Sequence, residues 1–350
     1  MVTGGFPAPG PQDREPRDWS HIPPPAGSPA VRPQSPMLTA HKPGIVALRP
    51  LQFGDILDGA VKAVRFNPKS MVGLSALVLA VFLVPSAALG VGSTHLMASF
   101  LDRFGPEAQA ALGLPTMVLQ LLSTSLATSL LSGLLMYVVG QAVLGRKPDP
   151  GETWRATRGR LLPLFGLIVL SGLFSLLSIA VLMGPGVLLL LNDSIAAGVV
   201  LELVGLLVLI VVVLAVSTKI LMAAPAIVLE GHGVFAGLRR SFALTKGSAF
   251  WRILGISLLA GFIAGIAAWL LGLPFAVIGS IIQLSAGQDV ETGQMGATFA
   301  SHLSALLTGA ITTPFVAAVT GLLYIDRRMR LEALDVVLLR EAQTNPAPRI

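Results

Sequence analysis

Six long apolar stretches alternate with short polar segments along the chain. Each stretch supplies the roughly 20 residues that an α-helix needs to cross the hydrocarbon core of a bilayer. Charged residues are scarce inside the stretches and gather between them. The pattern predicts an all-α, polytopic membrane helix bundle with six transmembrane helices, at residues 70–92, 116–144, 161–191, 197–228, 253–284 and 298–324.

A short amphipathic helix is predicted just before the first stretch. From Phe53 onward, apolar residues recur every three or four positions and form one stripe on a helix. Pro68 disfavours helical backbone in the residue before it, so this helix should end at Asn67. We expect it to lie along the membrane interface, with a stripe made of Phe53, Ile56, Leu57, Ala60, Val61 and Val64.

Comparable segments precede the third and fifth stretches, which indicates a three-fold internal repeat. One segment contains Trp154, and the other covers residues 234–242. Anchoring the copies on Gly73, Gly166 and Gly255 spaces them by 93 and 89 residues. Each copy would comprise one interfacial helix and two spans, so all copies would share one orientation. A last interfacial stripe is predicted at Leu331, Leu334, Val337 and Leu338.

The charges between the stretches fall on alternate sides. Cations crowd the segments after the second, fourth and sixth stretches, at residues 146–160, 239–252 and 327–340. The other three segments carry a single cation, Arg103, beside several carboxylates. The positive-inside rule therefore predicts that both termini are cytoplasmic. Besides the lipid bilayer itself, anionic lipid headgroups are the expected partners of the basic segments.

Composition excludes several other classes of protein. Charged residues make up 12% of the chain and hydrophobic residues 53%, whereas a soluble domain has about 25% charged residues. The net charge of +6 comes from cations that flank the spans, so nucleic acid is not an expected partner. The chain has no cysteine, which excludes disulfides and zinc–thiolate sites.

Three regions are predicted along the chain. Residues 1–43 are rich in proline and lack a periodic apolar pattern, which predicts a disordered cytoplasmic tail. Such a tail either extends into solvent or docks a proline-recognising partner, and its composition favours the first. Residues 44–341 should form the six-span membrane domain with its interfacial helices, and 342–350 a flexible end.

Small residues at intervals of four predict where the spans pack, because helices in lipid associate through close contact of small side chains. Gly184, Pro185 and Gly186 also predict a break in the third stretch. Broken spans and small-residue paths occur in transporters too, but helix packing is the favoured interpretation. The expected packing residues are Gly261 and Gly265 in the fifth stretch and Ala305, Gly309, Thr313, Ala317 and Gly321 in the sixth.

Polar side chains inside the apolar stretches are candidate functional residues, because polar groups are costly in hydrocarbon. Glu202 and Lys219 would lie ~25 Å apart on one helix, too far to pair. A proton relay would need a second acidic group at mid-membrane. No nucleophile, phosphate-binding or metal motif occurs, so we expect no catalytic residue, metal or cofactor. The candidates are Gln120, Gln141, Glu202, Lys219 and His302.

Several segments resemble a known family. They are residues 48–59 (LRPLQFGDILDG), 224–231 (APAIVLEG), 238–242 (LRRSF), 250–252 (FWR) and 324–332 (YIDRRMRLE). They are similar to an actinobacterial family of multi-span proteins and to the membrane domain of some glycerophosphodiester phosphodiesterases. In those enzymes the chemistry resides in a separate TIM barrel with a metal-binding His-Arg start. This chain has no His-Arg dipeptide and no room for a barrel, so the resemblance implies no activity.

The sequence thus favours a non-enzymatic integral membrane protein of a bacterial inner (cell) membrane. It would act as a scaffold or assembly partner for another membrane protein or for a second copy of itself. A transporter of a small solute or lipid is the alternative, suggested by the repeats and the prolines in the spans. An intramembrane lipid enzyme would rest on the family resemblance alone.

Overall fold

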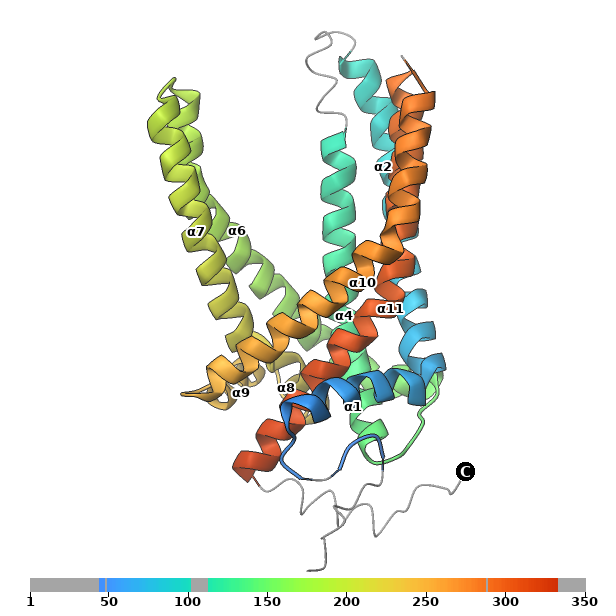
Figure 1. Cartoon of the computed structure of the whole chain (residues 1–350), viewed down its shortest axis with the longest axis vertical. Helices are drawn as coiled ribbons and strands as arrows, with labels where there is room; N and C mark the ends of the chain where they lie inside the picture. The colour runs from blue at the N-terminus through green and yellow to red at the C-terminus, as the bar shows by residue number, and fades with distance from the viewer. Residues whose placement is uncertain (1–43, 48, 102–112, 288, 333–350) are drawn as a thin grey trace, which may run out of the picture. The chain divides into compact units, whose positions relative to one another are not determined.

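Six long helices form the framework of the protein (Figure 1). The computed structural model describes residues 44–47, 49–101, 113–287 and 289–332. Every regular element in these ranges is helical, which confirms the predicted all-α fold. All described residues belong to one compact unit. The predicted tail, the C-terminal end and the stripe beyond residue 332 lie outside the described residues.

The six long helices match the six predicted spans. Apolar runs become helices in a membrane because a helix satisfies each backbone polar group within its own segment. All six are long and apolar enough to cross a membrane, so the chain is a multi-pass membrane protein. They are α2 (Leu74–Leu101), α4 (Gly113–Val143), α6 (Leu161–Leu191), α7 (Ile195–Ile220), α10 (Ala249–Ser285) and α11 (Val290–Glu332).

The fourth predicted span is broken near its end. After α7 ends at Ile220, the short helix α8 (Ala223–Leu229) begins. Pro225 has no N–H and cannot bond to the carbonyl four residues before it. The buried hydroxyl of Ser241 accepts the Met222 N–H at 3.1 Å and donates to the Lys219 carbonyl at 2.6 Å. A side chain from another helix thus replaces hydrogen bonds that the break removes.

Three short helices precede α2, α6 and α10, where interfacial helices were expected. They are α1 (Phe53–Phe66), α5 (Pro150–Thr157) and α9 (Val234–Leu244). The first ends at Asn67, as predicted. Its predicted stripe is only partly buried, because Ile56 and Ala60 are buried whereas Phe53 is 47% exposed. The smaller face containing Gly59 packs on α11, where it approaches Leu322 closely.

The spans pair in chain order. α2 packs on α4, α6 on α7, and α10 on α11, and each pair follows one of the three short helices. This order agrees with the repeat hypothesis. α11 also contacts α1, α2 and α4, and it contributes much of the core. α6 and α7 expose most of their large apolar side chains, as expected of helices whose solvent is lipid.

The predicted break of the third stretch is wrong. α6 is helical throughout, with Pro185 inside it. One proline removes a single helical hydrogen bond, and a closely packed neighbour can hold the rest of the helix in place. That neighbour is α7, because Gly205 brings it against the Leu182 carbonyl and Gly198 brings it against Leu190.

The prediction that small residues mark the packing faces of the spans is confirmed for glycines of α11 but not for those of α10. A Cβ atom on Gly309 would lie 2.9 Å from Leu79 of α2, and one on Gly321 would lie 2.9 Å from Val139 of α4. These glycines of α11 therefore allow close approach of other spans. Of the other predicted seam residues, Ala317 is buried, and Ala305 and Thr313 are half-buried.

The expectation for α10 is corrected. Gly261 and Gly265 are exposed, and within the described chain a Cβ atom on either would meet nothing within 4 Å. The buried face of the helix contains Ala260 and Ala264 instead, one residue earlier in each case. Within the described chain, the two glycines therefore pack against no neighbouring span.

Candidate functional site

The final turns of α11 hold two clusters of ion pairs. Residues four apart share a face of a helix, so Tyr324, Arg328 and Glu332 line one face. Asp326 and Arg330 line another in the same way. The Asp326 cluster consists of Arg252, Asp326, Arg330 and the backbone of Leu51. The Glu230 cluster consists of Glu230, His232, Arg240, Tyr324, Arg328 and Glu332.

The Asp326 cluster fastens three distant segments together. The side chain of Asp326 is fully buried, and its carboxylate accepts the Leu51 N–H at 2.8 Å and Arg330 Nε at 2.9 Å. Asp326 also forms an ion pair with Arg252. Arg252 and Arg330 both donate to the Leu51 carbonyl, at 2.9 and 2.7 Å. The segment before α1, the start of α10 and the end of α11 are therefore joined.

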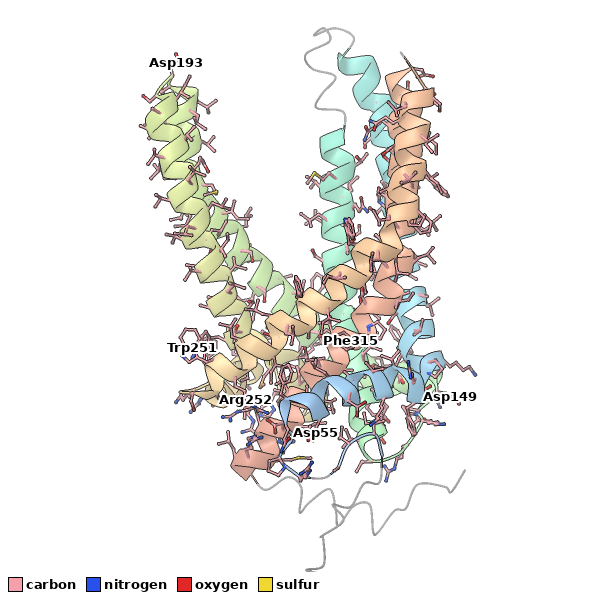
Figure 2. The ribbon with its side chains drawn as sticks, in the orientation of Figure 1. Asp55, Asp149, Asp193, Trp251, Arg252 and Phe315 are labelled. Atoms are coloured by element: carbon pink, nitrogen blue, oxygen red, sulfur yellow. The ribbon has the colours of Figure 1, made fainter. Side chains whose placement is uncertain are left out.

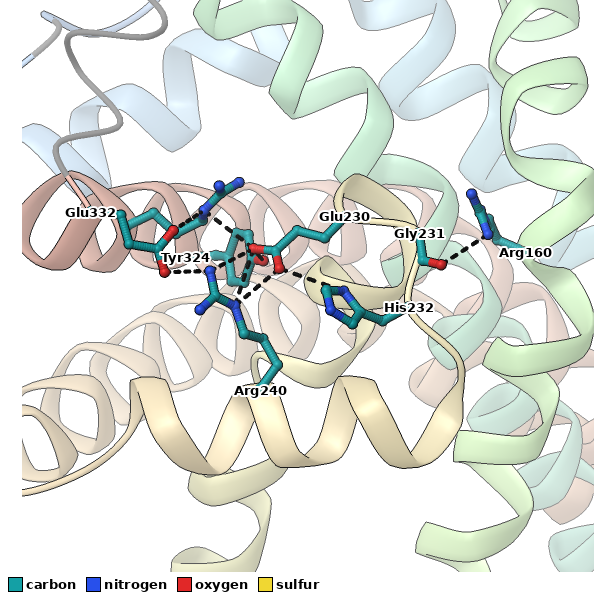
Figure 3. Close-up of polar contacts among 8 residues, drawn as sticks. Arg160, Glu230, Gly231, His232, Arg240, Tyr324 and Glu332 are labelled. Carbon is teal, nitrogen blue, oxygen red and sulfur yellow. Dashed lines mark hydrogen bonds and ion pairs between the residues drawn. The ribbon is translucent and has the colours of Figure 1, made fainter.

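The Glu230 cluster joins the end of α8 to α9 and α11 (Figure 3). Arg240 donates to both carboxylate oxygens of Glu230, with two N···O distances of 3.0 Å. Tyr324 donates its hydroxyl to the same carboxylate, and Arg328 Nε lies 3.2 Å from it. Glu332 pairs with both arginines. Each carboxylate thus meets two guanidinium groups, and each guanidinium meets two carboxylates.

A glycine turn positions Glu230. Gly231 has a φ of +74°, which residues other than glycine adopt only at a cost. The turn leads the chain from α8 into α9 while Glu230 keeps its contacts with α11. The carbonyl of Gly231 accepts Arg160 Nη1 at 3.1 Å, and His232 Nδ1 lies 3.5 Å from the Glu230 carboxylate (Figure 3).

The charges of the Glu230 cluster stabilise one another. Burial alone would raise the pKa of Glu230, but the hydrogen bond from Tyr324 and the charges of Arg240 and Arg328 outweigh it, so this pKa lies below its usual value. Burial likewise disfavours the charged form of Arg240, yet its bonds to Glu230 and Glu332 raise its pKa overall. Both groups therefore remain ionised at neutral pH.

This shift predicts acid sensitivity of the fold. A carboxylate with a lowered pKa contributes stability above its unfolded pKa of about 4.3 and loses it as the pH falls through the lower, folded value. The stability difference between the wild type and Glu230→Gln should therefore shrink as the pH falls below about pH 4. Thermal unfolding in detergent micelles across this range measures it. A difference that stays constant down to pH 3 would contradict the assignment.

Two of the intramembrane candidates connect helices. Gln120 Nε2 donates to the Ser301 carbonyl at 3.1 Å, and the Ser301 hydroxyl donates back to Gln120 Oε1 at 3.2 Å, which ties α4 to α11. His302 is buried, with Nδ1 2.9 Å from the Thr298 carbonyl and Nε2 3.1 Å from the Ser86 hydroxyl of α2. Because a carbonyl only accepts, His302 Nδ1 donates and Nε2 accepts from Ser86.

Lys219 and Gln141 lie nearer the arginine-rich end. Lys219 Nζ donates to the Thr245 carbonyl at 3.4 Å and lies 5.4 Å from the centroid of the Phe250 ring. Gln141 Oε1 accepts from Arg146 Nη1 at 3.5 Å. Both side chains thus contact neighbouring protein groups, and neither contacts the Glu230 or Asp326 cluster.

Glu202 differs from the other candidates. Its Oε1 atom is buried against Gly186 of α6 and has no hydrogen-bond partner among the described residues. The structure therefore brings no two of the five intramembrane candidates together into one site.

Neither ion-pair cluster is apparent as a site from the sequence pattern. The arginines at positions 240, 252, 328 and 330 follow the positive-inside rule and so read as topology signals. The clusters draw their residues from segments far apart in the chain, namely Leu51, Glu230, Arg240, Arg252 and the end of α11. The four-residue spacing of charged residues on α11, as in Asp326 and Arg330, was the only sequence pattern that pointed to the clusters. It could not identify the partners, because Leu51 and Asp326 are 275 residues apart.

In these two clusters, carboxylates and guanidinium groups neutralise one another and hold together segments that are distant in the sequence. The carboxylates at its centre are occupied by guanidinium, hydroxyl and backbone donors. Among the described residues, no three His, Asp or Glu side chains are placed to hold a metal ion. Comparisons of the chain with protein-family models, with curated proteins and with solved structures found no match.

Proposed function

We propose that this chain is a non-enzymatic membrane scaffold, which assembles another membrane protein or a second copy of itself within the bilayer. The observation that carries the proposal is the use of polar side chains inside the spans. Gln120 and His302 each bond to a neighbouring helix, as a permanently assembled bundle requires. Both bonds involve α11, and the two ion-pair clusters fasten the opposite end of that helix to other segments.

The proposed setting is a bacterial inner membrane with both termini in the cytoplasm. Asp193 lies at the opposite end of the helices from Arg252 (Figure 2), in keeping with the charge asymmetry of the sequence. Anionic lipid headgroups would then meet the arginine-rich end. Membership of the actinobacterial multi-span family is part of this proposal, and no phosphodiesterase activity is included in it.

Reconstitution into sealed vesicles tests the scaffold role. The purified chain should produce no gradient-dependent flux above that of empty vesicles, for small ions, amino acids or a fluorescent lipid. Photo-crosslinking from Leu203, which is 63% exposed on α7, should join the chain to one defined protein in native membranes. The same crosslinker at the buried Leu134 of α4 is the matched control. Gradient-dependent flux would contradict the proposal.

A transporter of a small solute or lipid is the second candidate. It is favoured by a cavity of about 390 Å³ between α4, α10 and α11, whose polar lining includes Gln120, Ser280, Gln283 and Ser304. The unpartnered Oε1 of Glu202 is a second favourable feature. If transport occurs, Gln120→Leu should abolish flux while the protein still folds.

A further inference from the structure

A separate polar pocket lies where α4 gives way to α5. It has a volume of about 350 Å³, and its polar lining consists of Tyr137, Gln141, Arg146, Lys147 and Glu152. About ten waters, at roughly 30 Å³ each, would occupy such a volume. The pocket shares no lining residue with the Asp326 or Glu230 cluster, and neither the scaffold role nor the transporter role uses it.

The pocket presents opposite charges that do not neutralise each other. Glu152 accepts the Tyr137 hydroxyl at 3.3 Å, and within the described residues it forms no ion pair with Arg146 or Lys147. Lys147 Nζ instead lies 4.6 Å from the centroid of the Phe66 ring, an arrangement that leaves ammonium hydrogens available. The lining thus combines cations with a carboxylate that retains acceptor capacity.

The position of the pocket corresponds to the lipid headgroup region. The candidate span of α4 ends at Val143, and Tyr137 lies within its last two turns. The Arg146 and Lys147 side chains follow directly after that end. Trp154, 46% exposed on the adjoining α5, is an aromatic residue of the kind found at membrane interfaces. A ligand in the pocket would therefore lie level with phospholipid headgroups.

We propose that this pocket binds the headgroup of phosphatidylethanolamine. Lys147 would contact the phosphate, and the Glu152 carboxylate would accept hydrogen bonds from the primary ammonium. A choline headgroup has no N–H to donate, and a glycerol headgroup offers only neutral hydroxyl donors, so neither can form a charge-assisted hydrogen bond from an ammonium group to Glu152. The lipid site requires that the chain spans a bilayer, but it is independent of the scaffold role.

Native mass spectrometry of the full-length protein tests the proposal. Phosphatidylethanolamine, phosphatidylcholine and phosphatidylglycerol with identical acyl chains would be offered at equal concentration in detergent. Ethanolamine lipid adducts should exceed choline lipid adducts by about fivefold, the upper range for an exposed charge pair. Glu152→Gln should remove this preference, whereas Lys147→Ala should reduce binding of all three lipids.

Matched controls come from the same region. Asp149→Asn removes the same charge as Glu152→Gln, but Asp149 does not line the pocket, so the preference should persist. Arg158→Ala is the equivalent control for Lys147→Ala. Free phosphoethanolamine at the same concentration should fail to displace the lipid, since it lacks the acyl chains. Equal retention of the three lipids, stronger retention of phosphatidylglycerol, or an unchanged preference in Glu152→Gln would overturn the proposal.

Discussion

Replacing Asp326 with alanine should lower the free energy of unfolding by about 2–3 kcal/mol. The substitution removes the carboxylate on which Arg252 and Arg330 converge, and it leaves the buried N–H of Leu51 without its acceptor. The two guanidinium groups that remain are 30% and 37% exposed, so water can solvate them, and the unsatisfied buried amide accounts for most of the loss. Unfolding of the purified protein in detergent micelles with increasing denaturant measures the loss.

Asp58→Ala is the matched control for this prediction. Asp58 also belongs to an ion pair four residues apart on a helix, but its side chain is 61% exposed and its partner is the exposed Lys62. Its removal should cost about 0.3–0.5 kcal/mol. If the two substitutions cost the same, the Asp326 cluster does not fasten the three segments in the folded protein.

Replacing Gly205 with valine should destabilise the protein by about 3 kcal/mol. A Cβ atom at this position would lie 2.4 Å from the Leu182 carbonyl oxygen and 2.7 Å from the Met183 methyl group. A backbone carbonyl cannot rotate away as a side chain can, so α6 and α7 would have to separate locally. The same denaturant experiment measures the effect.

Gly261→Val provides the comparison. Gly261 is exposed on α10 and a Cβ atom there meets nothing within 4 Å in the described chain. The expected change is within about 0.5 kcal/mol. A large loss at Gly261 together with none at Gly205 would reverse the assignment of which glycines carry packing.

The spans and the end of α1 could be predicted because they depend on local patterns. A run of about 20 apolar residues has few alternatives to a membrane helix. Pro68 likewise restricts the residue before it, which is why α1 ends at Asn67. Neither inference needs knowledge of what the segment contacts.

The helix faces that pack could not be predicted in the same way. The spacing of Gly261 and Gly265 is the same as that of Gly309 and its neighbours on α11. Only the second set meets other helices, because the rotation of each helix about its axis is fixed by contacts along its whole length. On α10 that rotation buries Ala260 and Ala264.

The ion-pair clusters were hidden for a related reason. Arg240 and Arg252 lie in the same basic segment after the fourth apolar stretch, and both follow the positive-inside rule, yet they belong to different clusters. The number of cations in a segment predicts on which side of the membrane it lies, but it does not predict which carboxylate each arginine pairs with. The fold distinguishes them by directing α9 and α10 to different faces of α11.

The hydrogen bonds of Ser241 link the position of α9 to the junction between α7 and α8, although α9 follows both helices in the chain. One hydroxyl holds the Met222 amide and the Lys219 carbonyl, so the angle at which α7 leaves α8 depends on where α9 lies. A partner or lipid that displaced α9 would either break these two hydrogen bonds or change the tilt of α7. A change at the short helix α9 can therefore alter the orientation of the lipid-facing helix α7.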